Sequence, residues 1–259
     1  MNAYRIFASV LMGWLWLSSA GCGLGSEPQT NGHSMSYWIG RTDFAPLISF
    51  HGEGGFRERK EAFNALAKIG APAVPALVKI VSDPKRKWDR RWSAVAALAE
   101  IGPPAIAAAP ALRAAMFDAS ISQNQFYEIP SALRKIGASK EAVPELTKWL
   151  EQTDPIEERH RLCIYECAMT LAEAGPAARP AIPVLVSYLK QQLATPDDWG
   201  ASRREECTAL GAIGDSRPEV LAVLKLAKAD KNEQVRASAT AALKRLEDAR
   251  LTTKDRPSQ

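Results

Sequence analysis

A short phrase that ends in glycine recurs five times along this chain, and its spacing constrains the fold more than any other feature. The phrase reads Ala-Leu-Ala-Lys-Ile-Gly up to Gly70 and returns, with substitutions, up to Gly102, Gly137, Gly175 and Gly214. Successive glycines lie 32, 35, 38 and 39 residues apart. A period in this range is typical of solenoids, in which neighbouring units bury a core that no unit could bury alone.

Each period predicts a pair of helices. Proline opens most of the segments that follow the glycines, as at Pro75 and Pro110, and proline is tolerated in a first helical turn. Apolar residues then recur three and four positions apart, as in Leu77, Ile80 and Val81, which is helix periodicity. The pattern favours an all-α protein, and we expect a right-handed α-solenoid of about six helical hairpins.

The expected hairpins divide the chain as follows. First helices are expected near 37–51, 72–82, 104–118, 140–153, 178–194 and 217–229. Second helices are expected near 56–69, 88–101, 121–136, 156–174, 199–213 and 232–248. Pro130 falls inside the third of these second helices, which should be kinked or start late. Gly102 and Gly214 are expected in left-handed backbone conformation just beyond helix ends.

The segment from Asp230 to Leu243 is the best single copy of the repeat. Its turn Asp, its Val235-Arg236 pair and its Ala-Ala-Leu ending resemble HEAT repeats, and more closely the HEAT-like repeats of bilin lyases. The resemblance covers residues 37–248. It implies a solenoid whose second helices line the concave face.

Arginine recurs at one equivalent position of the expected second helices. The second helices align on Leu66, Leu98, Leu133, Leu171, Leu210 and Leu243, and seven positions earlier stand Arg59, Arg91, Arg203 and Arg236, with Phe126 and Ile164 in the other two units. In the family that the chain resembles, this Arg meets a turn Asp of its own or the adjacent repeat. Asp83, Asp198 and Asp230 are the candidates here. The alternative is an arginine exposed to solvent that contributes little.

The N-terminus has the features of an export signal. Arg5 precedes an apolar run over residues 6–17, which is short for a membrane span. The run ends in Ser19-Ala20-Gly21-Cys22, which resembles a bacterial lipoprotein box, although leucine is usual where Ser19 stands. Lipidation of Cys22 would anchor the protein to a membrane of the cell envelope. Ordinary cleavage after Ala20, which would release a soluble periplasmic protein, is the alternative.

The chain therefore divides into four parts. We expect a signal peptide over 1–22, a flexible Gly/Ser/Pro-rich tether over 23–36, the repeat domain over 37–248 and a polar tail over 249–259. The 33 basic and 29 acidic residues nearly balance, so charge gives no case for nucleic-acid binding. We expect a monomer.

One group of residues could in principle bind a metal ion. His160, Cys163 and Cys167 follow at helical spacing, and Cys207 lies on the next second helix. Thiolates and imidazole are good zinc ligands, whereas free cysteines also behave as small buried hydrophobes. Free thiols, a Cys167–Cys207 disulfide and a metal site all remain open. Of these, we favour free buried thiols, because Cys167 lies four positions before the core residue Leu171, and we predict no metal site. No phosphate-binding loop or nucleophile elbow is present, and we predict no cofactor.

A row of aromatic and charged residues is the remaining candidate site. Six positions before the aligned leucines stand Lys60, Trp92, Tyr127, Tyr165 and Arg204, and Glu128, Glu166 and Glu205 follow in the next column. Aromatic and Arg clusters have the composition of binding hot spots. The alternative is that these rings fill seams between repeats.

The sequence thus predicts an exported, membrane-anchored scaffold that binds an unknown protein partner and has no catalytic activity. The alternative function is an accessory factor or metal-dependent enzyme that uses His160, Cys163, Cys167 and Cys207.

Overall fold

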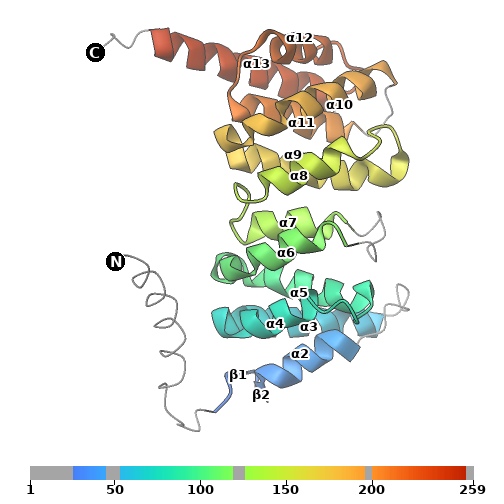
Figure 1. The fold of residues 1–259 in the computed structure, drawn as a ribbon, viewed down its shortest axis with the longest axis vertical. Helices are drawn as coiled ribbons and strands as arrows, with labels where there is room; N and C mark the ends of the chain where they lie inside the picture. The colour runs from blue at the N-terminus through green and yellow to red at the C-terminus, as the bar shows by residue number, and fades with distance from the viewer. Residues whose placement is uncertain (1–25, 45–52, 119–125, 196–199, 255–259) are drawn as a thin grey trace, which may run out of the picture.

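The chain folds into consecutive helical pairs that stack along one axis (Figure 1). The computed structural model describes residues 26–44, 53–118, 126–195 and 200–254. The first helices of the pairs are α2 (Met35–Phe44), α4 (Val74–Val81), α6 (Ala109–Ala115), α8 (Val143–Glu151), α10 (Ile182–Ala194) and α12 (Pro218–Ala227). The second helices are α3 (Glu53–Ile69), α5 (Trp88–Ile101), α7 (Glu128–Lys135), α9 (Arg161–Ala174), α11 (Ala201–Ile213) and α13 (Glu233–Lys254). The predicted solenoid of helical hairpins is confirmed.

Proline-rich 3₁₀ turns join one pair to the next. These turns are η1 (Ala71–Ala73), η2 (Pro103–Ala108) and η5 (Gly175–Ala181). Several first helices consequently begin later than expected; α6, for example, begins at Ala109, five residues after the predicted start at 104. The physical reason is that the prolines supply no N–H to an α-helical ladder.

The five glycines of the recurring phrase all have positive φ, between 58° and 82°. Gly214 adopts the expected left-handed conformation, with φ 76° and ψ 23°. Gly102 differs from the expectation, because its ψ is −144° at φ 71°. That conformation lies close to a region that only glycine populates. Gly102 therefore redirects the chain from α5 into η2 rather than capping it in left-handed geometry.

The third second helix starts late, as Pro130 predicts. Helix α7 begins at Glu128, so that Pro130 lies in its first turn, where no intrahelical N–H bond is lost. The carbonyl of Pro130 accepts a hydrogen bond from the Thr170 hydroxyl of α9 at 3.1 Å. The short helix is thereby attached to the next repeat.

Each second helix packs against the second helices before and after it. The aligned leucines Leu66, Leu98, Leu133, Leu171 and Leu210 are completely or almost completely buried, whereas Leu243 of the last repeat is half-buried. Helices α11 and α13 approach closely at Gly211, where an added Cβ would lie 2.8 Å from the Cβ of Ala242 in α13. Only glycine allows this spacing.

The N-terminal region contains an ordered hairpin where a flexible tether was expected. Strands β1 (Gln29–Thr30) and β2 (His33–Ser34) pair antiparallel across a turn in which Asn31 and Gly32 both have positive φ. An Asn-Gly pair is the preferred sequence for such a two-residue turn. The Trp38 indole of α2 is 2% exposed and donates to the Thr30 carbonyl at 3.0 Å, which holds the hairpin on the helix. A flexible tether was expected over 23–36, but residues 29–36 form this hairpin and the start of α2.

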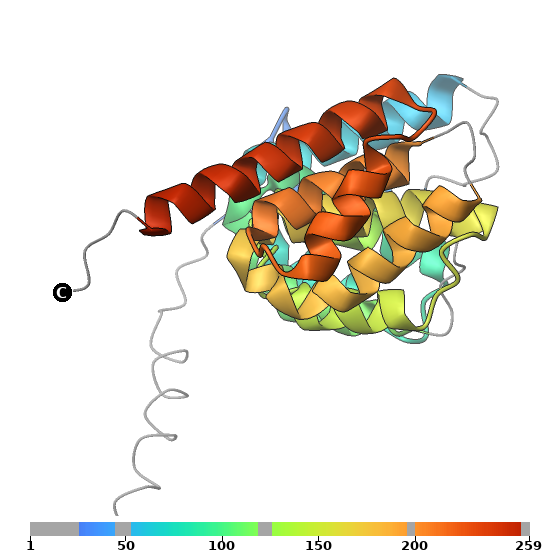
Figure 2. The ribbon, with the colours of Figure 1, turned by 90° about the horizontal axis from the view of Figure 1, so that it is seen from above.

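The C-terminal end also differs from the expected boundary. Helix α13 continues to Lys254, so part of the polar tail predicted over 249–259 is helical. Figure 2 shows α13 extending past the other helices of the stack. The residue that follows the aligned leucine in α13 is the exposed Lys244, and the equivalent residues of the earlier repeats are Ala67, Ala99, Arg134, Ala172 and Gly211.

In the described ranges no single helix is both long enough and apolar enough to cross a membrane. One pair of helices bent by 109°, 60–69 with 71–81, passes that test by length and composition alone.

We predict that Gly102→Ala lowers the free energy of unfolding by about 1–3 kcal/mol, because a residue with a Cβ is strained at this φ and ψ. The new Cβ would meet only the Lys135 carbonyl oxygen, at 3.8 Å, so strain rather than a clash is tested. The measurement is urea unfolding followed by circular dichroism.

Gly40→Ala is the matched control. Gly40 lies inside α2 with nothing within 4 Å of a built Cβ, and its φ is not positive. This variant should gain about 0.5–1 kcal/mol, since alanine is the better helix former. Equal stability of the two variants would contradict the role assigned to Gly102.

Candidate partner-binding surface

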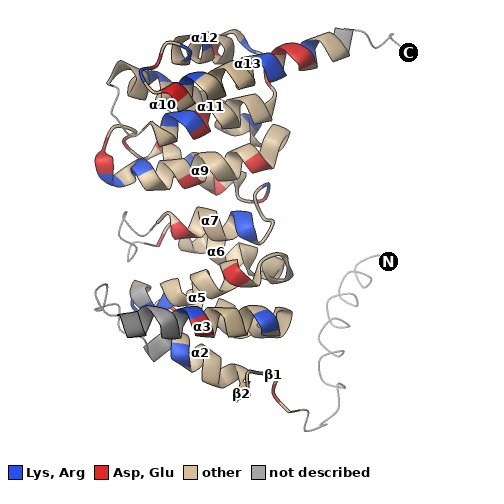
Figure 3. Cartoon of the chain, turned by 180° about the vertical axis from the view of Figure 1, so that it is seen from behind, with Lys and Arg blue, Asp and Glu red and all other residues tan. Residues whose placement is uncertain are grey.

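The second helices present equivalent positions along the whole stack, and this register defines the candidate surface. Figure 3, seen from behind, brings α3, α7 and α9 toward the viewer. Four positions before the aligned leucines, every residue is fully buried: Ala62, Ala94, Ile129, Cys167, Glu206 and Ala239. Six positions before them lie the aromatic and charged residues that the sequence singled out. The alignment from sequence therefore reproduces the spatial register.

Arginines seven positions before the leucines bind the turns of the repeats. Arg203 of α11 donates from Nε to Asp230 Oδ2 at 2.8 Å, and the two side chains are 2% and 1% exposed. Asp230 lies between α12 and α13, so the ion pair joins repeat five to repeat six. Arg236 donates to the carbonyls of Asp230 and Lys231, both at 2.8 Å. The predicted contact between this Arg column and a turn Asp is confirmed at Asp230.

Arg91 uses a turn Asp that sequence reasoning missed. Its Nε donates to the Val81 carbonyl at 2.6 Å, and its Nη1 pairs with Asp118 after α6. Asp83, which was the expected candidate, pairs instead with Arg86 at 3.3 Å. Asp198 and the side chain of Arg59 lie outside the described residues.

The three rings of the candidate row are half-buried in seams between second helices. Trp92 of α5 meets Phe63 of α3 edge-on, with ring centroids 6.4 Å apart. The Tyr165 ring of α9 lies 6.0 Å from the guanidinium of Arg204 in α11. Tyr127 precedes α7, and burial, with a smaller effect of Glu128, raises its pKa to about 12. The rings thus pack in the seams while part of each faces solvent.

The charged residues of the row are mostly paired within the protein. Glu166 of α9 accepts from Nη2 of Arg134 in α7 at 3.1 Å. Arg204 bonds to Glu205 at 2.8 Å and to Gln234 of α13 at 2.9 Å. Glu128 is half-buried, and Lys60 is exposed on α3. These bonds connect successive repeats and fix the charges in place.

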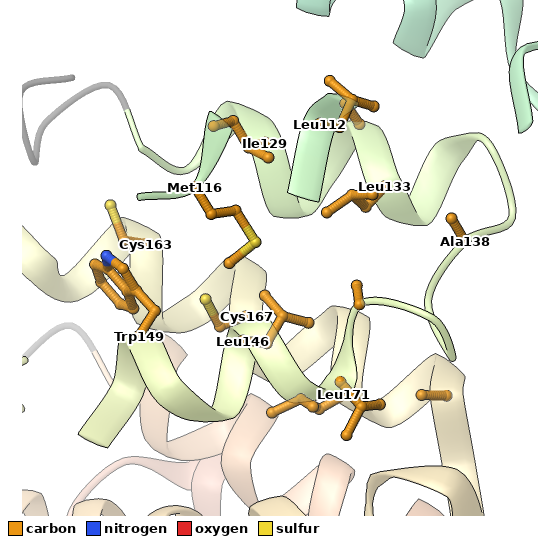
Figure 4. Packing of buried hydrophobic residues seen from close by; sticks show 14 of the residues in the cluster. Leu112, Met116, Ile129, Leu133, Ala138, Leu146, Trp149, Cys163, Cys167 and Leu171 are labelled. Atoms are coloured by element: carbon orange, nitrogen blue, oxygen red, sulfur yellow. The ribbon is translucent and has the colours of Figure 1, made fainter. Parts of the chain in front are cut away.

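The cysteines and His160 are placed in the core rather than around a common point. Cys163, Cys167 and Cys207 are free thiols with at most 1% of their surface exposed. Figure 4 shows the sulfur atoms of Cys163 and Cys167 among Met116, Leu146 and Trp149. Burial raises the pKa of Cys163 to about 12 and raises that of Cys167 and Cys207 as well, which opposes the thiolate form that binds metals.

His160 lies in the 3₁₀ turn η4 (Glu158–His160), not on α9 as the helical spacing suggested. Its Nδ1 is 3.0 Å from the Asp154 carbonyl oxygen and 3.5 Å from Glu157. Among the described residues, no three His, Cys, Asp or Glu side chains form a group that could hold a metal ion. The structure does not bring His160 and the three cysteines together around one point, as a metal-dependent enzyme or accessory factor that uses them would require.

A buried carboxyl group was missed by sequence reasoning. Glu206 of α11 is fully buried, Gln192 of α10 donates to its Oε1 at 2.9 Å, and its Oε2 has no hydrogen-bond partner. Burial raises the pKa of Glu206 well above its usual range, although Gln192 and Arg203 act in the opposite direction. A signal was present in the sequence, because Glu206 is the one charged residue in a column that otherwise holds Ala, Ile and Cys.

We predict a pH-dependent stability that originates at Glu206. The native state keeps this carboxyl protonated above pH 4.5, where the unfolded chain releases the proton, so stability falls as pH rises beyond 4.5. The free energy of unfolding falls by at most about 1.4 kcal/mol per pH unit. Glu206→Gln, which keeps the bond from Gln192, should remove this slope and be more stable than wild type at pH 7. The measurement is urea unfolding at a series of pH values.

Glu173→Gln is the control, since Glu173 is exposed on α9. It should follow the wild-type pH profile. A Glu206→Gln profile parallel to wild type would show that Glu206 is ionised in the native state.

Comparison with known proteins supports the fold alone. A designed armadillo repeat protein matches with a TM-score of 0.51 and 18% sequence identity, covering 82% of this chain and 100% of that chain. No protein-family model matches the sequence. No curated protein matches either. The structure is therefore an armadillo- or HEAT-like helical repeat.

Proposed function

We propose that this protein is an exported, lipid-anchored scaffold that binds a protein partner across its second helices and catalyses no reaction. The observation that carries the proposal is the row of half-buried rings and charges on consecutive second helices of a helical-repeat fold. Such folds are typical of protein binding, because their stacked repeats create extended surfaces.

The contacts within the row favour binding. Trp92 is held by Phe63, and Tyr165 is held by Arg204, which is itself bonded on both sides. Side chains that are already ordered lose little conformational entropy when a partner arrives. Their exposed edges offer aromatic surface that a partner can cover, and Lys60 offers a charge at one end of the row.

We predict that Trp92→Ala combined with Tyr165→Ala abolishes capture of the partner. Truncation of an aromatic hot spot costs about 2 kcal/mol of binding or more, roughly thirtyfold in affinity. The measurement is a quantitative pull-down from the native cell envelope. Since both rings also fill seams, circular dichroism must show wild-type helix content. A folded double variant that binds normally would place the interface elsewhere.

Two charge reversals at exposed lysines test partner binding without removing side chains that pack between helices. Lys60→Glu changes an exposed residue on α3, whereas Lys79→Glu changes an exposed residue on the first helix α4. Partner capture should weaken in the first variant and remain unchanged in the second. The reverse result would assign binding to the layer of first helices.

The sequence at Cys22 supports the proposed anchor. A single acyl chain gives only marginal membrane binding, so stable attachment requires the several chains of a processed lipoprotein cysteine. Cys22 follows small residues and an apolar run, as such processing requires.

Cys22→Ala should move the protein from the membrane fraction to the soluble fraction, which immunoblotting after fractionation measures. Ser19→Leu restores the usual residue of the lipoprotein box and should leave the protein in the membrane fraction. Identical partition of Cys22→Ala and wild type would contradict the anchor.

A further inference from the structure

The described part of the chain begins a few residues after the proposed anchor in the sequence. The Glu27 carboxylate accepts from the Ser36 backbone N–H at 2.6 Å and from its hydroxyl at 2.7 Å. The Met35 N–H donates to the Pro28 carbonyl at 2.8 Å. Glu27 is thus attached to the start of α2, and the chain is held from this residue onward.

Only five residue steps separate Glu27 from Cys22. A fully extended chain covers about 3.3–3.6 Å per residue, so these steps span at most about 18 Å. A lipid on Cys22 would therefore keep the N-terminal end of the solenoid beside the membrane surface. A tether of this length cannot bring the distant last repeat to the bilayer while the first repeat points away.

The surface at this end has the composition of a membrane interface. Residues 28–40 contain no Lys, Arg, Asp or Glu. Tyr37 is 40% exposed and stacks on the exposed His33, with ring centroids 4.0 Å apart. Tyrosine is enriched at membrane–water interfaces, where its ring is partly desolvated while its hydroxyl meets polar groups.

The opposite end has the reverse character. Helix α13 carries charges along most of its length, namely Glu233, Arg236, Lys244, Arg245, Glu247, Asp248, Arg250 and Lys254. Helix α2 contains two charged residues, Arg41 and Asp43, and Figure 3 shows α13 with several charged bands. The two terminal helices of the described stack therefore differ in how many charged residues they carry.

We propose that the β1–β2 hairpin and α2 form a lipid-facing surface, so that the solenoid stands on the membrane with its first repeat at the lipid headgroups. This inference rests on the proposed lipidation of Cys22. Packed helices lie about 8–10 Å apart, so the last second helix is about 40–50 Å farther from the bilayer than the first. The second helices then present the partner-binding row at increasing heights above the membrane.

The test measures which end of the lipidated protein approaches lipid. A thiol-reactive fluorophore is placed at Gln29→Cys in β1 or at Leu251→Cys in α13, both exposed positions. The native cysteines 163, 167 and 207 are buried, which protects them from the reagent. Each protein is reconstituted in phosphatidylcholine vesicles that contain a lipid with a nitroxide headgroup. Emission should be quenched at position 29 and unaffected at position 251.

Equal quenching at the two positions, or stronger quenching at 251, would overturn the proposal. A flexible Gly/Ser segment inserted between Gly25 and Ser26 should reduce quenching at 29, because it removes the short restraint; unchanged quenching would refute the tether argument. Mass spectrometry of Cys22 separates the two proposals. A lipidated Cys22 with equal quenching at the two positions refutes this inference alone, whereas an unmodified Cys22 refutes the anchor and the inference that rests on it.

Discussion

The structure depends on burial of apolar surface between consecutive second helices. A helical pair of this size cannot cover its own apolar face, so each repeat completes the core of its neighbours. A fully buried leucine contributes about 1.5–3 kcal/mol relative to an exposed one. The aligned leucines and the column four positions before them supply this burial at every junction. Where the stack ends, Leu243 loses part of its cover and charged residues appear on α13.

Polar contacts then fix how the repeats sit on one another. The buried pair Arg203–Asp230 and the bonds from Arg91 to Val81 and Asp118 connect a second helix with a turn. Removal of one partner from a buried pair leaves an uncompensated charge, which is why such contacts specify one arrangement. Glu206 is the opposite case, since its second carboxyl oxygen has no partner and its burial favours the neutral form.

The proposed function rests on the same geometry. The repeats place Trp92 and Tyr165 at equivalent positions, and contacts with Phe63 and Arg204 hold the rings in seams that are also part of the surface. The hairpin around Trp38 lies a few residues after Cys22 in the sequence, so the direction in which the surface is presented would be coupled to the proposed anchor. The proposed binding surface and its proposed orientation would thus be properties of the stack rather than of single repeats.

The resemblance to HEAT repeats implied that the arginine column meets a turn Asp, and the structure decided which pair forms, Arg203 with Asp230. The sequence by itself determined the repeat architecture, the pairing of helices and a kink or late start of the third second helix at Pro130. These features are local or periodic, so a register read from one chain is sufficient to find them. Only the tertiary structure decided that Gly102 leaves the left-handed region, that Arg91 pairs with Asp118 and that Gly211 touches Ala242. The physical reason is that backbone strain, the choice of ion-pair partner and the close approach of two helices depend on the distance and angle between neighbouring repeats. The periodicity of the sequence does not encode that distance or angle.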